Sequence, residues 1–155
     1  MPLSASQIER YSRQIIVPRV GGRAQERLLG SRLVIAGDAH DVEPALLYLV
    51  GSGVGHIELA LGKDVDRANE LASGTTELNP EVTVTALSEL PDSRTQLVLG
   101  IIGSPASLAT VGALVTRFPH TGWVAARIDS PARPNHSSSN SPGATWCCTR
   151  PIDRT

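Results

Sequence analysis

The sequence has few aromatic residues, few cysteines and no excess of either charge. Aromatic residues make up 3% of the 155 residues while all hydrophobic residues make up 41%, so the core must consist of Leu, Val, Ile and Ala. The formal net charge is -1, so nothing in the charge count suggests the basic surface that nucleic-acid-binding domains carry. We therefore expect one domain by length, with no nucleic-acid partner.

The two cysteines, Cys147 and Cys148, are adjacent. Neighbouring cysteines seldom bridge each other, so a disulfide scaffold is excluded. Without a second cysteine pair, and with no suitably spaced partner for His120 or His136, a tetrahedral zinc site is not expected. A sulfur-carrying or thioester role remains an alternative, but we favour two small structural side chains because no neighbouring base or cation would lower a thiol pKa.

Long hydrophobic runs are also absent. No run approaches the ~18 residues that a membrane-spanning helix needs. The N-terminal residues are polar and lack the apolar region of a signal peptide. We therefore expect a soluble, cytoplasmic protein without a membrane partner.

The chain is organised around residues 32–55. Residues 32–36 are typical of a buried strand, residues 37–41 predict a tight turn, and residues 43–52 predict a helix. That helix has an apolar face made of Ala45, Leu46, Leu49 and Val50. Such a turn carries glycines where the backbone approaches a phosphate at the helix N-terminus. Here only Gly37 stands at its start, and three acids, Asp38, Asp41 and Glu43, take up much of the rest.

Strands and helices alternate along the rest of the chain. Further strands are predicted at 56–61, 82–86, 97–102 and 122–128, and helices at 5–17, 22–29, about 65–75 and 106–117. Ser4 and Gln7 form a capping box for the first helix. The last helix is expected to bury one broad face made of Leu108, Val111, Ala113, Leu114 and Val115. This order predicts an α/β fold: a Rossmann-like, doubly wound, mostly parallel sheet flanked by helices, with a short N-terminal helical segment.

The composition changes after residue 129. Residues 130–145 are rich in Pro, Gly and Ser, which is typical of a loop or a disordered tail. We therefore divide the chain into a domain at 1–129 and a tail at 130–155, in which residues 146–155 can add a short edge segment.

Three motifs resemble one known family. Residues 9–16 read ERYSRQII, residues 44–49 read PALLYL and are followed by Gly53-Val54-Gly55, and residues 77–80 read ELNP. The combination resembles the ThiF/MoeB/HesA family, the bacterial relatives of the ubiquitin-activating enzymes, over about residues 8–128. The resemblance implies a Rossmann-like fold of the NAD/FAD-binding type in a homodimer. It also implies ATP and magnesium binding, and adenylation of the C-terminal glycine of a ubiquitin-like sulfur carrier.

The residues that carry the family's chemistry differ here. Its phosphate turn, GxGGxG, aligns with Gly37, Ala39, His40 and Val42, so side chains would occupy space that phosphates need. The acids of this turn would also repel a triphosphate, each by about 1 to 4 kcal/mol at ~4 Å depending on the dielectric.

The other nucleotide-binding positions are altered as well. The second predicted strand is followed by residues 61–63, LGK, and lacks the acid with which the family binds a ribose. The family's next segment, which carries a phosphate-binding arginine, is missing. Arg67 stands for the family's lysine and Gly103 for its magnesium-binding aspartate. Arg13 keeps the position of the arginine that reaches into the partner subunit's site. The alternative for Arg13 is a surface or interface ion pair, which we favour.

The turn at 37–43 has two interpretations. It is either a rewired ligand site, in which His40 or the acids bind a cation, or an ordinary turn in which Asp41 or Glu43 caps the helix. We favour the capped turn because capping needs only one acid.

The family resemblance and the altered nucleotide-binding positions leave three possible functions. The first is a noncatalytic binding and dimerisation module (a pseudoenzyme) that has lost the ATP-binding residues, needs no cofactor, and pairs with itself or with a ThiF/MoeB-like paralogue. The second is an active, ATP- and magnesium-dependent adenylating enzyme for a ubiquitin-like or sulfur-carrier protein. The third is a binder of another nucleotide or dinucleotide, which the missing ribose acid opposes.

Overall fold

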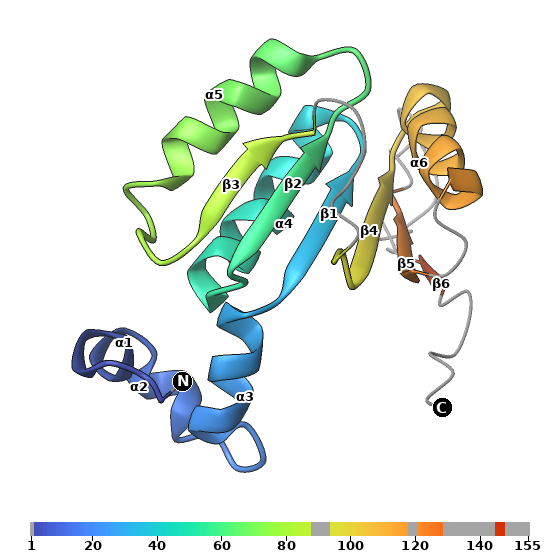
Figure 1. Ribbon diagram of the computed structural model, residues 1–155. Helices are drawn as coiled ribbons and strands as arrows, with labels where there is room; N and C mark the ends of the chain where they lie inside the picture. The colour runs from blue at the N-terminus through green and yellow to red at the C-terminus, as the bar shows by residue number, and fades with distance from the viewer. Residues whose placement is uncertain (1, 88–93, 118–120, 129–144, 148–155) are drawn as a thin grey trace, which may run out of the picture.

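A computed structural model describes residues 2–87, 94–117, 121–128 and 145–147 (Figure 1). At its centre is a six-stranded sheet with the strand order β3-β2-β1-β4-β5-β6. Five strands are parallel, and the sixth, β6, pairs with β5 in the antiparallel direction. The strands are β1 (Arg32–Ala36), β2 (His56–Ala60), β3 (Thr83–Ala86), β4 (Leu97–Ile102), β5 (Gly122–Arg127) and β6 (Thr145–Cys147). The predicted α/β fold with a mostly parallel sheet is confirmed.

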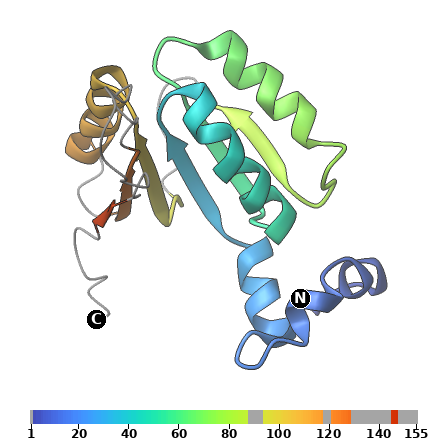
Figure 2. The same cartoon turned by 180° about the vertical axis from the view of Figure 1, so that it is seen from behind.

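Helices cover both faces of this sheet. One face carries α4 (Ala39–Ser52) and α5 (Val65–Thr75), and the other carries α6 (Pro105–Arg117) (Figures 1 and 2). Three short helices lie beyond the end at which β1 begins: α1 (Ala5–Arg10), α2 (Ser12–Ile15) and α3 (Gly21–Leu29). We call α1 to α3 the arm.

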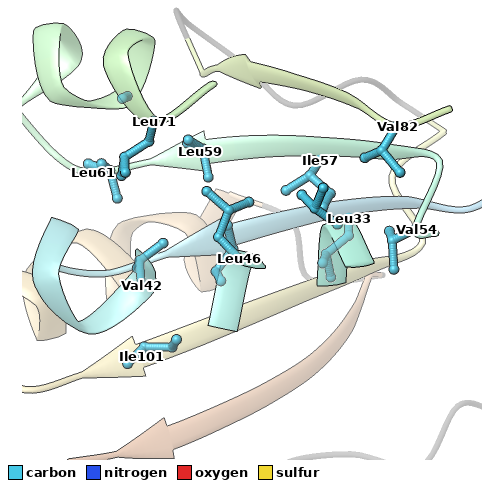
Figure 3. Packing of buried hydrophobic residues seen from close by; sticks show 13 residues of the cluster. Leu33, Val42, Leu46, Val54, Ile57, Leu59, Leu61, Leu71, Val82 and Ile101 are labelled. Atoms are coloured by element: carbon cyan, nitrogen blue, oxygen red, sulfur yellow. The ribbon is translucent and has the colours of Figure 1, made fainter. Parts of the chain in front are cut away.

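Alternating side chains along β1 divide the core into two clusters. Leu33 and Ile35 face α4 and α5, and pack with residues such as Leu46, Ile57 and Leu71 (Figure 3). Val34 and Ala36 face the other way and pack with Val98, Val111, Leu114 and Trp123. The core is mainly aliphatic, as the composition predicts.

The helix at the centre of the sequence begins earlier than predicted. It starts at Ala39 rather than residue 43, so the predicted turn at 37–41 is shorter. Val42 explains the difference, because it is buried in one row with Leu46 and Val50 at four-residue spacing. Val42 therefore belongs to the core, and does not face the place where phosphates were expected.

Two other helix predictions are corrected. The predicted helix at 5–17 is interrupted at Tyr11, which is buried and separates α1 from α2. Its Ser4–Gln7 capping box is present. On α6 the buried residues are Ser107, Val111 and Leu114, whereas Leu108 and Val115 are exposed and Ala113 also faces solvent. The helix buries a narrow stripe because only one sheet face lies beneath it.

Most of the predicted tail, residues 130–144 and 148–155, lies outside the described residues, and the boundary at residue 129 stays a prediction. Among the described helices, none has the length and apolar character that a membrane span requires.

Candidate functional site

The predicted site residues gather where the strand order reverses. β1 and β4 are neighbours in the sheet although β2 and β3 lie between them in the chain. Gly37 follows β1 and Gly103 follows β4, so both lie at the carboxyl end of adjacent parallel strands. Ligand sites of open α/β sheets lie in the crevice at this switch point. The structure therefore brings Gly37, Ala39, His40 and Gly103 to the place where a site is expected.

Gly37 has a structural role at this point. A Cβ atom on Gly37 would lie 2.5 Å from the carbonyl oxygen of Ile101 on β4, which is closer than real contacts allow. Its amide donates a hydrogen bond to the carbonyl of Ala60 at 3.2 Å. The close approach of β1 and β4 thus requires glycine here whether or not a ligand binds.

The crevice beside Gly37 contains a carboxylate of the protein itself. A Cβ atom on Gly103 would overlap the carboxylate of Asp41, so this acid lies where a side chain at position 103 would begin. Its other oxygen is 3.1 Å from Nε2 of His40. The Asp41 side chain is only 11% exposed, whereas that of His40 is 81% exposed. Asp41 thus fills the space between the first turn of α4 and the β4–α6 turn.

The β4–α6 turn satisfies its own amides. The buried hydroxyl of Ser107 accepts hydrogen bonds from the amides of Gly103 (3.1 Å) and Ser104 (2.9 Å). The hydroxyl of Ser104 accepts one from the amide of Ser107 at 3.1 Å. The sequence analysis did not single out Ser107, although its position three residues after Ser104 is a usable signal of a capped helix start.

Arg67 is held by two glutamates. Its Nη2 is 3.0 Å from Oε2 of Glu43 on α4, and its Nη1 is 3.0 Å from Oε2 of Glu70 on α5. The hydrogen bond to Glu70 and the charge of Glu43 raise the pKa of Arg67 above its ordinary value. The guanidinium therefore bridges α4 and α5 through carboxylates.

The favoured capping interpretation of the turn is wrong. Asp38 is the N-cap residue of α4, and its side chain makes no capping hydrogen bond. In the described residues Asp41 pairs with His40, and Glu43 pairs with Arg67. A capping side chain must fold back over the first turn, whereas these two carboxylates have partners elsewhere. The sequence could not show the Glu43–Arg67 contact because it joins α4 to α5, whereas His40 is the immediate neighbour of Asp41 on α4.

Arg13 is not brought to the site within one chain. It lies on α2, in the arm, and the arm is at the opposite end of the sheet from the carboxyl ends of the strands (Figure 1). Within the described part of the chain, no group of three or more His, Cys, Asp or Glu side chains is placed to hold a metal ion.

The motifs that carry the family resemblance meet at the amino end of the sheet instead. Asn79 donates from Nδ2 to the hydroxyl of Tyr11 (2.9 Å) and to the carbonyl of Val50 (2.8 Å), and all these atoms are buried. Gly53 ends α4 with a left-handed backbone (φ 88°). A Cβ on Gly53 would lie 2.8 Å from the Tyr11 ring. We call Tyr11, Gly53 and Asn79 the joint, because their contacts connect the arm to the sheet and the helices that cover it.

Gln25 is a buried polar residue that sequence reasoning missed. It lies on α3, and its Nε2 donates to the carbonyl of Ser52 at 2.9 Å. Its Oε1 is buried without a partner among the described residues. A second arm contact joins Gln7 Nε2 to Glu81 Oε2 at 2.7 Å.

The chain is similar to curated proteins over part of its length. It is 43% identical over 68 residues to the adenylyltransferase and sulfurtransferase uba4 of Neosartorya fischeri, a match that covers 44% of this chain and 14% of that protein. It is 42% identical over 69 residues to the SAMP-activating enzyme E1 of Haloferax volcanii, covering 44% and 26% respectively. The matches thus span about a quarter or less of these relatives. No family model matches the chain.

Solved structures share the fold. The tRNA N6-threonylcarbamoyladenosine dehydratase TcdA of E. coli superposes with a TM-score of 0.59 at 17% identity, covering 81% of this chain and 62% of that chain. E. coli MccB, in a structure with MccA-N7isoASN, superposes with a TM-score of 0.55 at 18% identity, covering 76% and 43%. At these identities the likeness shows the fold alone.

Proposed function

Since the chain is related over part of its length to the ThiF/MoeB family of adenylyltransferases, we propose that it is a noncatalytic binding and dimerisation module of that family. Its partner is a second copy of itself or a ThiF/MoeB-like paralogue, and a ubiquitin-like or sulfur-carrier protein is a further candidate. The proposed location is the cytoplasm. No bound cofactor is part of this function.

The observation that carries the proposal is the filling of the crevice by the protein's own acids. Asp41 lies against Gly103, and Glu43 pairs with Arg67, the residue that stands for the family's lysine. With Asp38, three carboxylates stand within six residues and no Lys or Arg lies among them. Each carboxylate within about 4 Å of a phosphate would oppose its binding by roughly 1 to 4 kcal/mol. These carboxylates support the proposal that ATP with magnesium does not bind here.

Calorimetry with ATP and magnesium tests this proposal. We expect no binding heat at millimolar ATP, because the phosphates would have to approach the carboxylates of Asp38, Asp41 and Glu43. Arg67→Ala is the diagnostic variant, and Arg27→Ala, the same change on the exposed side of α3, is its matched control. Micromolar affinity that Arg67→Ala removes and Arg27→Ala leaves intact would refute the noncatalytic role.

One observation favours an active enzyme as the second candidate. The carboxylate of Asp41 occupies the place where a side chain at position 103 would begin, so it can stand in for the magnesium-binding aspartate that the family resemblance expects there. Two relatives are also named for adenylyltransferase or activating activity. In this reading ATP and magnesium would be cofactors for adenylation of a ubiquitin-like or sulfur-carrier protein.

Pyrophosphate exchange in the presence of candidate carrier proteins separates the two functions. Carrier-dependent exchange that Asp41→Asn abolishes would establish the enzyme. If exchange is absent with every candidate carrier, the noncatalytic module stands. Asp66→Asn, an exposed acid on α5, is the control for a general effect of removing charge.

A further inference from the structure

The turn between α2 and α3 is an exposed apolar segment. Residues 16–20, with the sequence IVPRV, are all exposed, and four of the five are apolar. Ile16 is 78% exposed and Val17 is 47% exposed. In both views of the molecule this turn lies at the outer end of the arm, away from the sheet (Figures 1 and 2). We call residues 16–20 the tip.

The tip reverses the chain within four residues. The amide of Val20 donates a hydrogen bond to the carbonyl of Val17 at 3.1 Å, which closes the turn. Pro18 is the second residue of this turn, and Arg19, with a φ of 73°, is the third. Proline in the second place and a positive φ in the third are typical of a type II turn, which favours glycine in the third place. The backbone therefore does not explain why an arginine stands there.

The charge of the arm is opposite to that of the rest of the chain. Residues 5–29 contain five arginines and two glutamates, a formal charge of +3. Because the whole chain has a net charge of -1, the remaining residues carry a formal charge of -4. Within the part of the chain that the structure describes, Arg19, Arg23 and Arg27 have no ion-pair partner. The tip thus lies beside positive charge that no described acid neutralises.

This combination of shape and charge favours a lipid surface over a groove on another protein. Aliphatic side chains on a projecting turn can enter the boundary between head groups and acyl chains, which needs no matching cavity. Nearby arginines are attracted to anionic lipids over about a Debye length. The same surface repels the negative remainder of the chain, so the separation of charge turns the arm toward the lipid.

We propose that the tip docks this protein on the surface of an anionic lipid bilayer. Ile16, Val17 and Val20 enter the head-group boundary, while Arg19 and Arg23 pair with lipid phosphates. This docking goes beyond the proposed function and does not depend on whether a nucleotide binds at the carboxyl end of the sheet. It differs from the expectation of no membrane partner, which was based only on membrane-spanning runs and the absence of a signal peptide.

Co-sedimentation of the full chain with vesicles tests the proposal. We expect binding to vesicles that contain phosphatidylglycerol, and binding at least about tenfold weaker to pure phosphatidylcholine, which does not attract the arginines. Val17→Asp should weaken binding to the anionic vesicles by about tenfold or more. Val115→Asp is the matched control, because Val115 is 43% exposed on α6. No binding to the anionic vesicles, or equal losses in the two variants, would overturn the proposal.

Arg19→Gly separates docking from folding. Glycine suits the positive φ at this position, so the urea midpoint should not fall, whereas binding to the anionic vesicles should weaken by about fivefold at low salt. The difference should shrink as salt is added. Arg117→Gln, which removes an exposed arginine at the end of α6, should leave binding unchanged. Full binding by Arg19→Gly at low salt would contradict docking through the tip.

Two further measurements identify a different occupant of the tip. If the tip binds an acidic protein, the chain should bind polyglutamate and not the vesicles. If it binds a second copy of the chain, Val17→Asp should convert a dimer into a monomer in sedimentation equilibrium, again without vesicle binding. Either result would overturn the proposal. The ATP and pyrophosphate experiments contain no lipid, so failure of the noncatalytic role and failure of this docking can be told apart.

Discussion

The polar side chains at the amino end of the parallel sheet and those at its carboxyl end differ in burial and in the partners that they bind. At the amino end, Tyr11, Gln25 and Asn79 are buried, and their hydrogen bonds link segments far apart in the chain. At the carboxyl end, His40 and Arg67 reach solvent, and their partners are carboxylates of neighbouring helices or of the same turn. A buried hydrogen bond is costly to break because it leaves an unsatisfied polar group, whereas an exposed ion pair contributes little.

This difference explains why the family resemblance is carried by residues far from the expected chemistry. The motif residues Tyr11, Gly53 and Asn79 hold the arm to the sheet domain, and a change in any of them disturbs buried contacts. Among the residues expected to decide nucleotide binding, His40 and Arg67 reach solvent and can change without disturbing the core, whereas Gly37 is required by the close approach of β1 and β4. The motifs by which the resemblance is recognised therefore indicate the fold of this protein, and they do not indicate whether it binds a nucleotide.

The largest effect is expected from Gly55→Ala at the amino end. A Cβ there would overlap the backbone carbonyl of Leu29, which cannot move without shifting α3. We expect a loss of about 4 kcal/mol or more in the free energy of unfolding, measured by urea denaturation. Gly74→Ala, in open space in the last turn of α5, should change it by no more than about 1 kcal/mol. Equal effects of the two changes would contradict the close packing of the amino end.

Asn79→Ala should have the next largest effect. It leaves the Tyr11 hydroxyl and the Val50 carbonyl without their partner in a buried place, which costs about 3 kcal/mol. Asn69→Ala on the exposed side of α5 should stay within about 0.5 kcal/mol. If Asn79→Ala is as mild as Asn69→Ala, the joint does not hold the arm by hydrogen bonding.

Arg67→Ala should have the smallest effect, although it removes two ion pairs. Both pairs are partly exposed, so water and salt screen them. We expect the urea midpoint to shift much less than in Asn79→Ala, and the shift to vanish near about 1 M salt. A salt-independent shift as large as that of Asn79→Ala would show that the carboxyl end contributes to the fold as strongly as the amino end.

Local patterns were sufficient to predict most elements. β4 at 97–102 and α5 at 65–75 have the predicted bounds, because an uninterrupted apolar run and a helical pattern between polar breaks are signals within a few residues. The start of α4 was predicted late because Val42 was assigned to a turn; its burial depends on the sheet beneath it. Gln25 was missed because nothing in its neighbours marks a buried polar side chain, whereas the three-residue spacing of Ser104 and Ser107 was a signal that went unused.

The sequence by itself determined the alternation of strands and helices, the aliphatic core and the motifs that resemble the ThiF/MoeB/HesA family, since these depend on spacing and side-chain type. Only the tertiary structure decided that Tyr11 meets Asn79, 68 residues away, and that the Asp41 carboxylate lies against Gly103. Such contacts depend on how helices pack across the sheet. Residues distant in the chain become neighbours only after the apolar faces are buried.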